Sequence, residues 1–164
     1  MAIACVAGRH HAVEHVHPAR HRLHQVLVHG YTGITYVDRD GEQQTPTIRF
    51  LSSDASRNTY HAVNQLTLRS RQAERRFDVV LYVNGIALGV IELKRSWVSV
   101  SEGIRQNIGN QKQHFVRPFF TTVQLLFAGN DVEGLRYGVI DTPEKYWLEW
   151  KEPGEEPNPL DRSL

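Results

Sequence analysis

The sequence is poor in cysteine, and it has no long apolar run. Cys5 is the only cysteine among 164 residues, which excludes a disulfide framework within the chain. The longest apolar runs, VVLYV and LLFA, are far shorter than the roughly 20 residues that a membrane-spanning helix needs, and the start lacks a signal-peptide pattern. We therefore expect a cytoplasmic protein with no membrane contact.

An excess of charge of one sign is also missing. Nineteen Lys and Arg stand against 18 Asp and Glu, and the net charge of +1 gives no global attraction to a polyanion. The distribution is uneven, however, because four arginines fall within eight residues: Arg69, Arg71, Arg75 and Arg76. Such a cluster is either a solvated loop or a patch that contacts phosphate groups. A hydrophobic content of 40% over this length fits one domain with a real core.

The first half of the chain predicts one helix followed by short strands. A helix should begin at Pro18 and end at Gly30, with Leu23, Val26 and Leu27 on its buried face. Residues 33–51 and 58–70 have the patterns of short strands, the first with a turn at Asp40 and Gly41. Within 58–70, side chains should alternate between the two faces of the strand.

The second half predicts a hairpin, a helix and further strands. Residues 77–94 form an apolar hairpin around Asn84-Gly85, and residues 99–115 form a helix that starts with a Ser99/Glu102 capping box. A buried strand over 119–131 and another over 135–140 should follow. Trp147 and Trp150 favour packing against the sheet over stacking on bases. The predicted fold class is α/β, with a central mixed sheet flanked by helices.

Asp78, Glu92 and Lys94 lie at the open end of the hairpin, and its register decides whether they meet. A two-residue turn would place Asp78 opposite Ile91 and send Glu92 to the other face. A three-residue loop with a bulge at Gly85 would place Asp78 opposite Glu92, with Lys94 on the same face. We favour the bulged loop, because it alone assembles a site.

Two carboxylates that face each other repel unless a cation lies between them. Asp78 and Glu92, with water and the Leu93 carbonyl, form an all-oxygen ligand set of the kind that suits Mg²⁺. With Lys94 nearby, such a site fits metal-assisted hydrolysis of a phosphodiester. The alternative is an exposed Glu92–Lys94 pair at a strand end, which would have little energetic weight.

These residues carry a resemblance to a known family. The segment NTYHAVNQLTLRSRQAERRFDVVLYVNGIALGVIELKRS, and the text that follows it to about residue 152, resembles the N-terminal nuclease domain of the type I restriction endonuclease R subunit. This domain belongs to the PD-(D/E)xK nucleases. The resemblance implies a restriction-endonuclease-like core, an endodeoxyribonuclease activity and Mg²⁺ as cofactor.

Carried over by position, Asp78 and Glu92 bind the metal and Lys94 completes the active site. The family often adds a Q-x-x-x-Y motif on the next helix, for which Gln106 fits although Asn110 stands in place of Tyr. A second candidate is Gln111, which is followed by Phe115. We favour Gln106 from its distance to Lys94 in sequence. The predicted DNA-binding residues are Arg69, Arg71, Arg75, Arg76 and Arg95.

The resemblance also implies a domain organisation and partners. We predict a poorly matched His-rich segment over 1–20, a nuclease domain over 21–151 and a linker-like tail over 152–164. In the family a motor that hydrolyses ATP follows, but no G-x-x-x-x-G-K-[ST] loop occurs here. The implied partners are double-stranded DNA and the methyltransferase and specificity subunits. Two other interpretations stay open: a non-catalytic fragment that binds DNA or docks on the complex, and a stand-alone repair nuclease.

Overall fold

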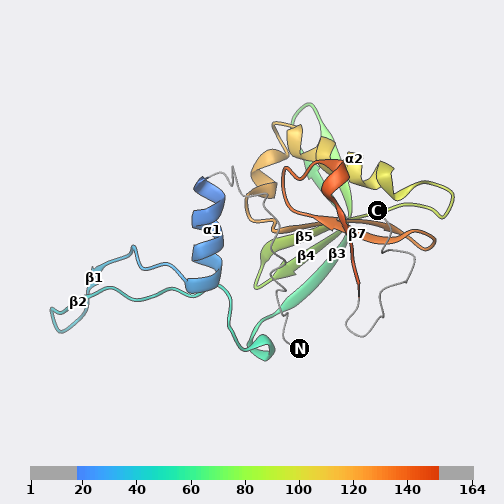
Figure 1. The fold of residues 1–164 in the computed structure, drawn as a ribbon. Coiled ribbons are helices and arrows are strands. Elements are labelled where there is room, and N and C mark those ends of the chain that lie inside the picture. The colour runs from blue at the N-terminus through green and yellow to red at the C-terminus, as the bar shows by residue number, and fades with distance from the viewer. Residues whose placement is uncertain (1–17, 152–164) are drawn as a thin grey trace. The chain divides into compact units, whose positions relative to one another are not determined.

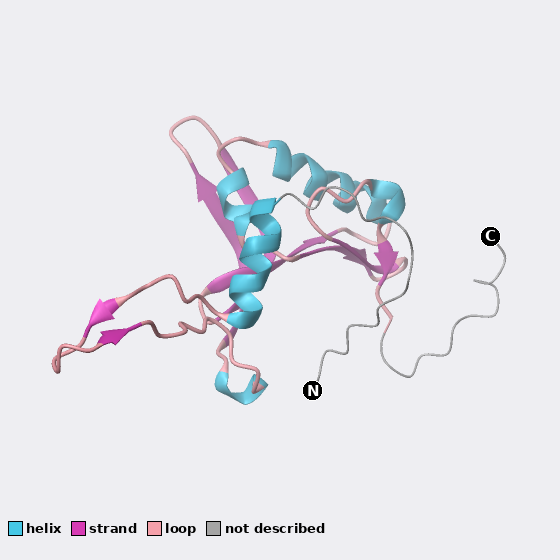
Figure 2. Ribbon diagram, turned by 60° about the vertical axis from the view of Figure 1, so that its left-hand side comes forward, coloured by secondary structure: helices cyan, strands magenta, loops and turns pink. Residues whose placement is uncertain are grey.

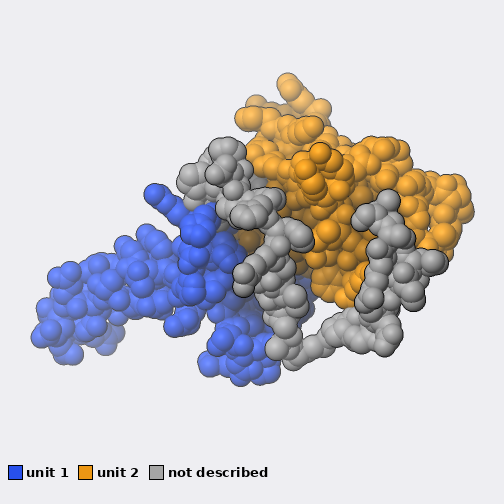
Figure 3. Space-filling view, in the orientation of Figure 1, with its two compact units in different colours: residues 1–61, 82–86 blue, residues 62–81, 87–164 orange. Residues whose placement is uncertain are grey.

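The structure is a computed structural model that describes residues 18–151. These residues divide into two units, which Figure 3 colours separately. Within the described part, unit 1 comprises residues 18–61 and 82–86, and unit 2 comprises residues 62–81 and 87–151. The predicted segments 1–17 and 152–164 lie outside the described residues, and the predicted domain boundaries remain predictions.

Unit 1 contains one helix and a small hairpin. Helix α1, Pro18–His29, has Leu27 buried and ends before Gly30, whose φ of +87° closes the helix as a left-handed residue. Strands β1, Tyr36–Val37, and β2, Gln43–Gln44, pair antiparallel, and a short 3₁₀ helix, η1, spans Ala55–Arg57. The predicted helix and the predicted turn at Gly41 are confirmed.

The Asn84-Gly85 turn belongs to unit 1, where Asn84 also forms hydrogen bonds to the loop around residues 50–59. The Asn84 backbone N–H donates to Thr59 O, and its side-chain Oδ1 accepts from Thr59 N, both at 2.8 Å. Its Nδ2 donates to Phe50 O at 2.8 Å and to Asn58 Oδ1 at 2.9 Å. Asn84 therefore tolerates a φ of 51° and also fixes the neighbouring loop.

Most of the six-stranded sheet lies in unit 2. Its strands follow the chain in order, and β5 pairs parallel with β6 whereas β6–β7 and β7–β8 are antiparallel, so the sheet is mixed as predicted. A parallel pair needs a crossover, which here contains helix α2. The strands are β3 (Tyr60–Arg69), β4 (Glu74–Val83), β5 (Ile86–Leu93), β6 (Leu125–Asn130), β7 (Gly134–Gly138) and β8 (Leu148–Glu149).

Helix α2, Val100–Lys112, lies along one face of this sheet in both ribbon views (Figures 1 and 2). Gly103 permits the close approach, since a Cβ at this position would lie 3.1 Å from the Cβ of Ala128 on β6. Asn107 Nδ2 donates to the Phe127 carbonyl at 2.9 Å. Because Glu92 pairs with Ala128 in the β5–β6 register, α2 covers the end of β5 that carries the predicted site.

The segment after α2 differs from the prediction. The helix ends at Lys112 and not near Phe115, and residues Arg117–Thr121 form a 3₁₀ helix, η2, where a strand was expected. The reason is tertiary packing, because Phe119 and Phe120 surround the buried Phe77 with ring centroids 5.1 and 5.8 Å away. Strand β6 begins only at Leu125.

The C-terminal part of unit 2 packs against the sheet. A third 3₁₀ helix, η3, spans Glu144–Tyr146, and the Trp147 indole that follows is buried and donates to the Thr142 carbonyl at 3.2 Å. The Trp150 ring lies 5.7 Å from the rings of both Phe127 and Tyr137. These contacts agree with the predicted packing of both tryptophans. Among residues 18–151, no helix has the length and apolar character needed to cross a membrane.

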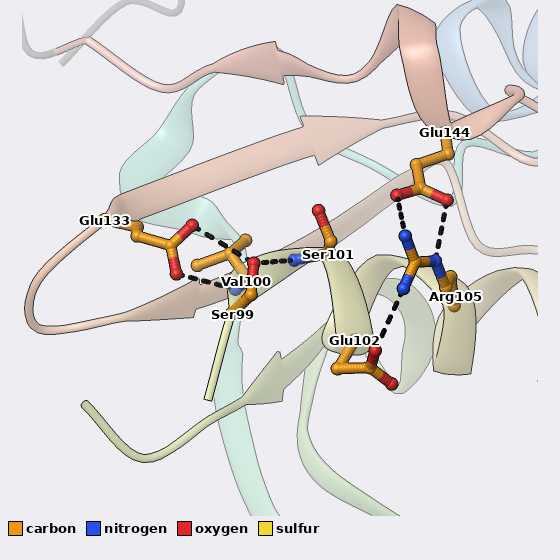
Figure 4. A network of polar contacts seen from close by, with 7 residues as sticks. All are labelled: Ser99, Val100, Ser101, Glu102, Arg105, Glu133 and Glu144. Atoms are coloured by element: carbon orange, nitrogen blue, oxygen red, sulfur yellow. Dashed lines mark hydrogen bonds and ion pairs between the residues drawn. The ribbon is translucent and has the colours of Figure 1, made fainter. Parts of the chain in front are cut away.

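The N-terminus of α2 is capped, but not by the predicted capping box. Ser99 Oγ accepts from Ser101 N at 3.3 Å, whereas the carboxylate that reaches the helix start belongs to Glu133, which accepts from Val100 N at 3.0 Å (Figure 4). Glu102 instead pairs with Arg105 at 2.9 Å. A distant residue has thus replaced the local one, because the turn after β6 brings Glu133 to the helix start.

Candidate active site

The β4–β5 hairpin turns through two residues, Asn84 and Gly85. Both have positive φ, 51° and 80°, as a type I′ turn requires. The predicted three-residue loop with its bulge at Gly85 is therefore wrong. The pairing of the strands, and not the turn alone, decides which side chains face each other.

Further along the hairpin, β5 contains one more residue between the turn and each pairing position than β4 does. A Cβ on Gly89 would lie 3.4 Å from the Cβ of Leu81, so these two residues face each other. Strict counting from the turn would instead pair Leu81 with Leu88. With the extra residue included, continued counting places Asp78 opposite Glu92. The two carboxylates are therefore neighbours although the loop is short.

The Glu92 carboxylate is buried under α2 and receives two amide donors from the helix. Gln106 Nε2 donates to Glu92 Oε2 at 2.6 Å, and Asn110 Nδ2 donates to Oε1 at 3.3 Å. Gln106 Oε1 accepts from Lys94 Nζ at 2.6 Å. One glutamine thus connects the ammonium to the carboxylate, with both of its polar atoms used.

The environment of Glu92 disfavours its charge. Burial raises its pKa to about 7, and the negative charge of Asp78 acts in the same direction. The cations of Lys94 and Arg75 lower the pKa of Glu92 but do not cancel the effect. At neutral pH the site therefore holds one carboxylate that is only partly ionised beside another, with Lys94 and Arg75 as the neighbouring cations.

Asp78 is held by the strands on both sides of it. Its Oδ2 accepts from the backbone N–H of Leu93 at 2.8 Å. Its Oδ1 lies 3.5 Å from Nε2 of Gln65, on the neighbouring strand β3. The carboxylate belongs to the middle strand of the three, β4, so contacts from both neighbours fix its direction.

The donors present fit a hard divalent cation. Asp78 and Glu92 supply carboxylate oxygens, and no group of three or more His, Cys, Asp or Glu side chains in metal-binding arrangement occurs among the described residues. Magnesium needs no more, because one or two carboxylates with water and substrate oxygens complete its shell. A cation between the two carboxylates would favour the ionised form of Glu92 and so would lower its pKa.

The predicted DNA-contacting arginines differ in their surroundings. Arg69 forms an exposed ion pair with Glu74 at 2.8 Å, and the Arg95 guanidinium lies 5.4 Å from the centre of the exposed Trp97 ring. Arg71 and Arg76 are exposed. Arg75 is half-buried, and its buried Nε has no hydrogen-bond partner within the described part of the chain. The cluster is thus divided between solvent and the edge of the site.

Of the two glutamines proposed for the helix motif, the structure places only Gln106 in the site. Gln111 instead accepts from the backbone N–H of Asp141 at 2.8 Å and donates to Asn107 O at 3.0 Å. Sequence reasoning missed Asn110 as a partner of Glu92, and it missed Gln65. A polar residue one helical turn beyond Gln106 was a usable signal for Asn110. No sequence pattern indicated Gln65.

The fold and the site together define a class. A mixed α/β sheet, with two carboxylates, a lysine and a glutamine gathered beside one helix, is compatible with a nuclease-like protein. The model of the family described as type I restriction enzyme R protein N terminus matches residues 9–145. The chain belongs to this family.

Individual relatives agree with the family match. The endonuclease subunits of the type I restriction enzymes SauMSSORF170P and SauCOLORF180P, from Staphylococcus aureus strains MSSA476 and COL, are each 28% identical to this chain over 96 residues. The match covers 58% of this chain and 10% of each relative. The chain thus corresponds to a small part of the length of these relatives.

Proposed function

We propose that this chain is the Mg²⁺-dependent nuclease domain of a type I restriction enzyme R subunit and that it hydrolyses phosphodiester bonds in double-stranded DNA. The observation that carries the proposal is the chain of contacts from Lys94 Nζ through Gln106 to the Glu92 carboxylate, with Asp78 beside it. A structural ion pair would need no glutamine between the charges. A site that must hold a metal and a lysine at a fixed separation does.

In this proposal each side chain has a defined task. Asp78 and Glu92, with the Leu93 carbonyl, would hold Mg²⁺, which when bound supplies charge stabilisation at the phosphate and acidifies water. Lys94 is half-buried, so that its ammonium can reach an attacking water or a developing negative charge on the phosphate. Gln106 keeps the Lys94 ammonium in place by accepting a hydrogen bond from it, and Asn110 keeps Glu92 from rotating.

DNA contacts in this proposal come from the arginines around the site. Arg71, Arg76 and Arg95 expose their charges, and phosphate contacts of this kind add affinity without sequence information. Target recognition would therefore belong to another polypeptide. Methyltransferase and specificity subunits, and an ATP-hydrolysing motor in the longer protein, are the partners that the family implies.

Nicking of supercoiled plasmid in the presence of Mg²⁺ tests the proposal. The wild-type chain should nick DNA, and Lys94→Met should lower the rate by about 10²- to 10³-fold while leaving the fold intact, because one electrostatic contact to the transition state is lost. Glu92→Ala should abolish nicking. Lys145→Met, which removes an exposed lysine on η3, is the matched control and should cleave like wild type.

The same experiment separates the proposal from the interpretation as a non-catalytic fragment. If wild type and Glu92→Ala bind DNA equally and neither nicks it at any Mg²⁺ concentration, the chain only binds. Because nicking by the isolated chain is expected of the proposed domain and of a stand-alone nuclease alike, those two are separated by adding the methyltransferase and specificity subunits, which should change cleavage only if the chain belongs to a type I complex.

A further inference from the structure

Gln65 has an unusual backbone conformation. Among the described residues, three other than glycine have positive φ: Gln65 at 56°, Asn84 at 51° and Asp141 at 63°. Asn84 and Asp141 lie in turns, and Asn and Asp are the residue types that accept the left-handed region most readily. Gln65 instead lies in the interior of β3, away from any turn.

The left-handed conformation of Gln65 interrupts the regular alternation of side chains along β3. The predicted alternation of β3 is broken, because Leu66, Thr67 and Leu68 are all partly buried in succession. A left-handed residue within a strand acts as a bulge, which redirects a side chain that regular pleating would point elsewhere. Residues held in such conformations are concentrated at functional sites.

The redirected side chain points to the candidate active site. Nε2 of Gln65 lies 3.5 Å from Oδ1 of Asp78, at the long end of hydrogen-bond distances, while Oδ2 of the same carboxylate accepts from Leu93 N at 2.8 Å. The Asp78 carboxylate is therefore contacted at one oxygen by a backbone amide and at the other by a side-chain amide. Together the two contacts define the plane of the carboxylate.

We propose that Gln65 is a positioning residue of the metal site, and that β3 keeps a strained conformation at this residue in order to orient the Asp78 carboxylate. This inference rests on the proposed function, since orientation matters only if Asp78 is a metal ligand. Groups that orient a metal ligand typically change metal affinity or activity by about 10- to 100-fold when removed. A contact of purely structural value would change stability instead.

Gln65→Gly separates these two effects. Glycine adopts positive φ without strain, so the variant should keep or raise the melting temperature of the full chain. Because the amide is lost, the Kd for Mn²⁺, measured by electron paramagnetic resonance of the free ion, should rise about tenfold. The rate of Mg²⁺-dependent nicking should fall by a similar factor. A gain in stability together with a loss of metal affinity is the expected signature.

Two further variants complete the experiment. Gln65→Ala removes the amide but keeps the strained backbone. It should therefore lose Mn²⁺ affinity like Gln65→Gly but melt at a lower temperature than Gln65→Gly. Asp141→Gly makes the same backbone change at the left-handed residue beside Arg117, and it should leave Mn²⁺ affinity and nicking unchanged.

The outcomes distinguish this inference from the proposed function. If wild type binds Mn²⁺ and nicks DNA, and Gln65→Gly matches it in both, the inference is overturned and the proposed function stands. If the affinity of Gln65→Gly falls only together with its melting temperature, the role is structural and the inference is again overturned. If wild type neither binds Mn²⁺ nor nicks DNA, both fail.

Discussion

Helix α2 carries two polar networks that look alike in geometry and differ in surroundings. On its exposed side, Arg105 pairs with Glu102 at 2.9 Å and Glu144 at 3.0 Å, and all three side chains are at least 37% exposed (Figure 4). In its middle, Gln106 and Asn110 contact Glu92, which is fully buried. The two networks differ in charge, since one consists of ion pairs and the other of amide–carboxylate hydrogen bonds, and they differ in exposure to solvent.

Exposure to solvent decides how much each network contributes to the free energy of unfolding. Exposed ion pairs are screened by water and typically contribute about 0–1 kcal/mol to stability. A buried polar group that loses its partner costs about 1–3 kcal/mol, because no water replaces the lost bond. Loss of a contact in the buried network, which has fewer formal ion pairs, should therefore cost more stability than loss of a contact in the exposed network. Variants of each network make this quantitative.

The largest effect should come from the charge of Glu92. The pKa of this carboxyl is about 7 in the folded chain against 4.5 for an ordinary glutamate, so the folded state binds more protons than the unfolded state between these values. Its contribution to stability is therefore fully present below about pH 4.5 and is lost as the pH rises through about 7. The loss is on the order of 3 kcal/mol.

Urea unfolding from pH 5 to pH 8 measures this effect. Glu92→Gln should remove most of the decline and be the more stable form at pH 8, since the Asn110 amide can turn and accept from the new amide. Glu74→Gln controls for the loss of one exposed carboxylate. Added Mg²⁺ should raise the stability of wild type at pH 8 but not that of Glu92→Gln. A wild-type profile that rises over this range would contradict the pKa shift.

The second effect concerns Asn110, which is fully buried. Asn110→Ala removes the donor to Glu92 Oε1 and leaves a buried carboxylate oxygen without it, so the free energy of unfolding at pH 8 should fall by about 1–3 kcal/mol. At pH 5, where Glu92 is protonated, the loss should be smaller. Equal losses at both pH values would indicate a packing defect and not a charged hydrogen bond.

A smaller effect is expected at the start of α2. Glu133→Ala removes the carboxylate that accepts from Val100 N and from the Ser99 hydroxyl, and loss of a helix cap typically costs about 1 kcal/mol. The variant should unfold at lower urea with an unchanged denaturant slope, and its cost should not vary between pH 6 and pH 8. A cost above that of Asn110→Ala would show that the helix cap matters more than the buried contact to Glu92.

The smallest effect should follow the loss of the exposed arginine. Arg105→Ala breaks the pairs with Glu102 and Glu144, yet the free energy of unfolding should change by less than about 1 kcal/mol. Because exposed pairs are screened, 0.5 M NaCl should make the difference smaller still. A cost that is large and insensitive to salt would show that exposure does not separate the two networks.

Much of the fold could be predicted from local patterns. Pro18 and Gly30 mark the ends of α1, Asn84-Gly85 marks the hairpin turn, and Ser99 marks the start of α2. These signals depend on residues that are adjacent in sequence, so no knowledge of the rest of the chain is needed. Where a distant group intervened, prediction failed: Glu133 displaced Glu102 at the cap, and packing around Phe77 turned an expected strand into η2.

The candidate site shows the same division. The spacing around the hairpin indicated Asp78, Glu92 and Lys94, and the resemblance to the family added Gln106. The sequence favoured Gln106 but left Gln111 open, and it missed Gln65 and Asn110. Those choices depend on how α2 and β3 lie against β5 and β4, which the spacing of residues along the chain does not specify.

By itself, the sequence determined which groups are available to this protein: two carboxylates, an ammonium and amides, at the ends of elements whose boundaries are encoded locally. The tertiary structure alone decided that Asp78 and Glu92 face each other through a shifted register and that α2 buries Glu92. The physical reason is that the pKa of a carboxyl, unlike the start of a helix, is set by the solvent it loses and the charges it meets, and both come from distant parts of the chain.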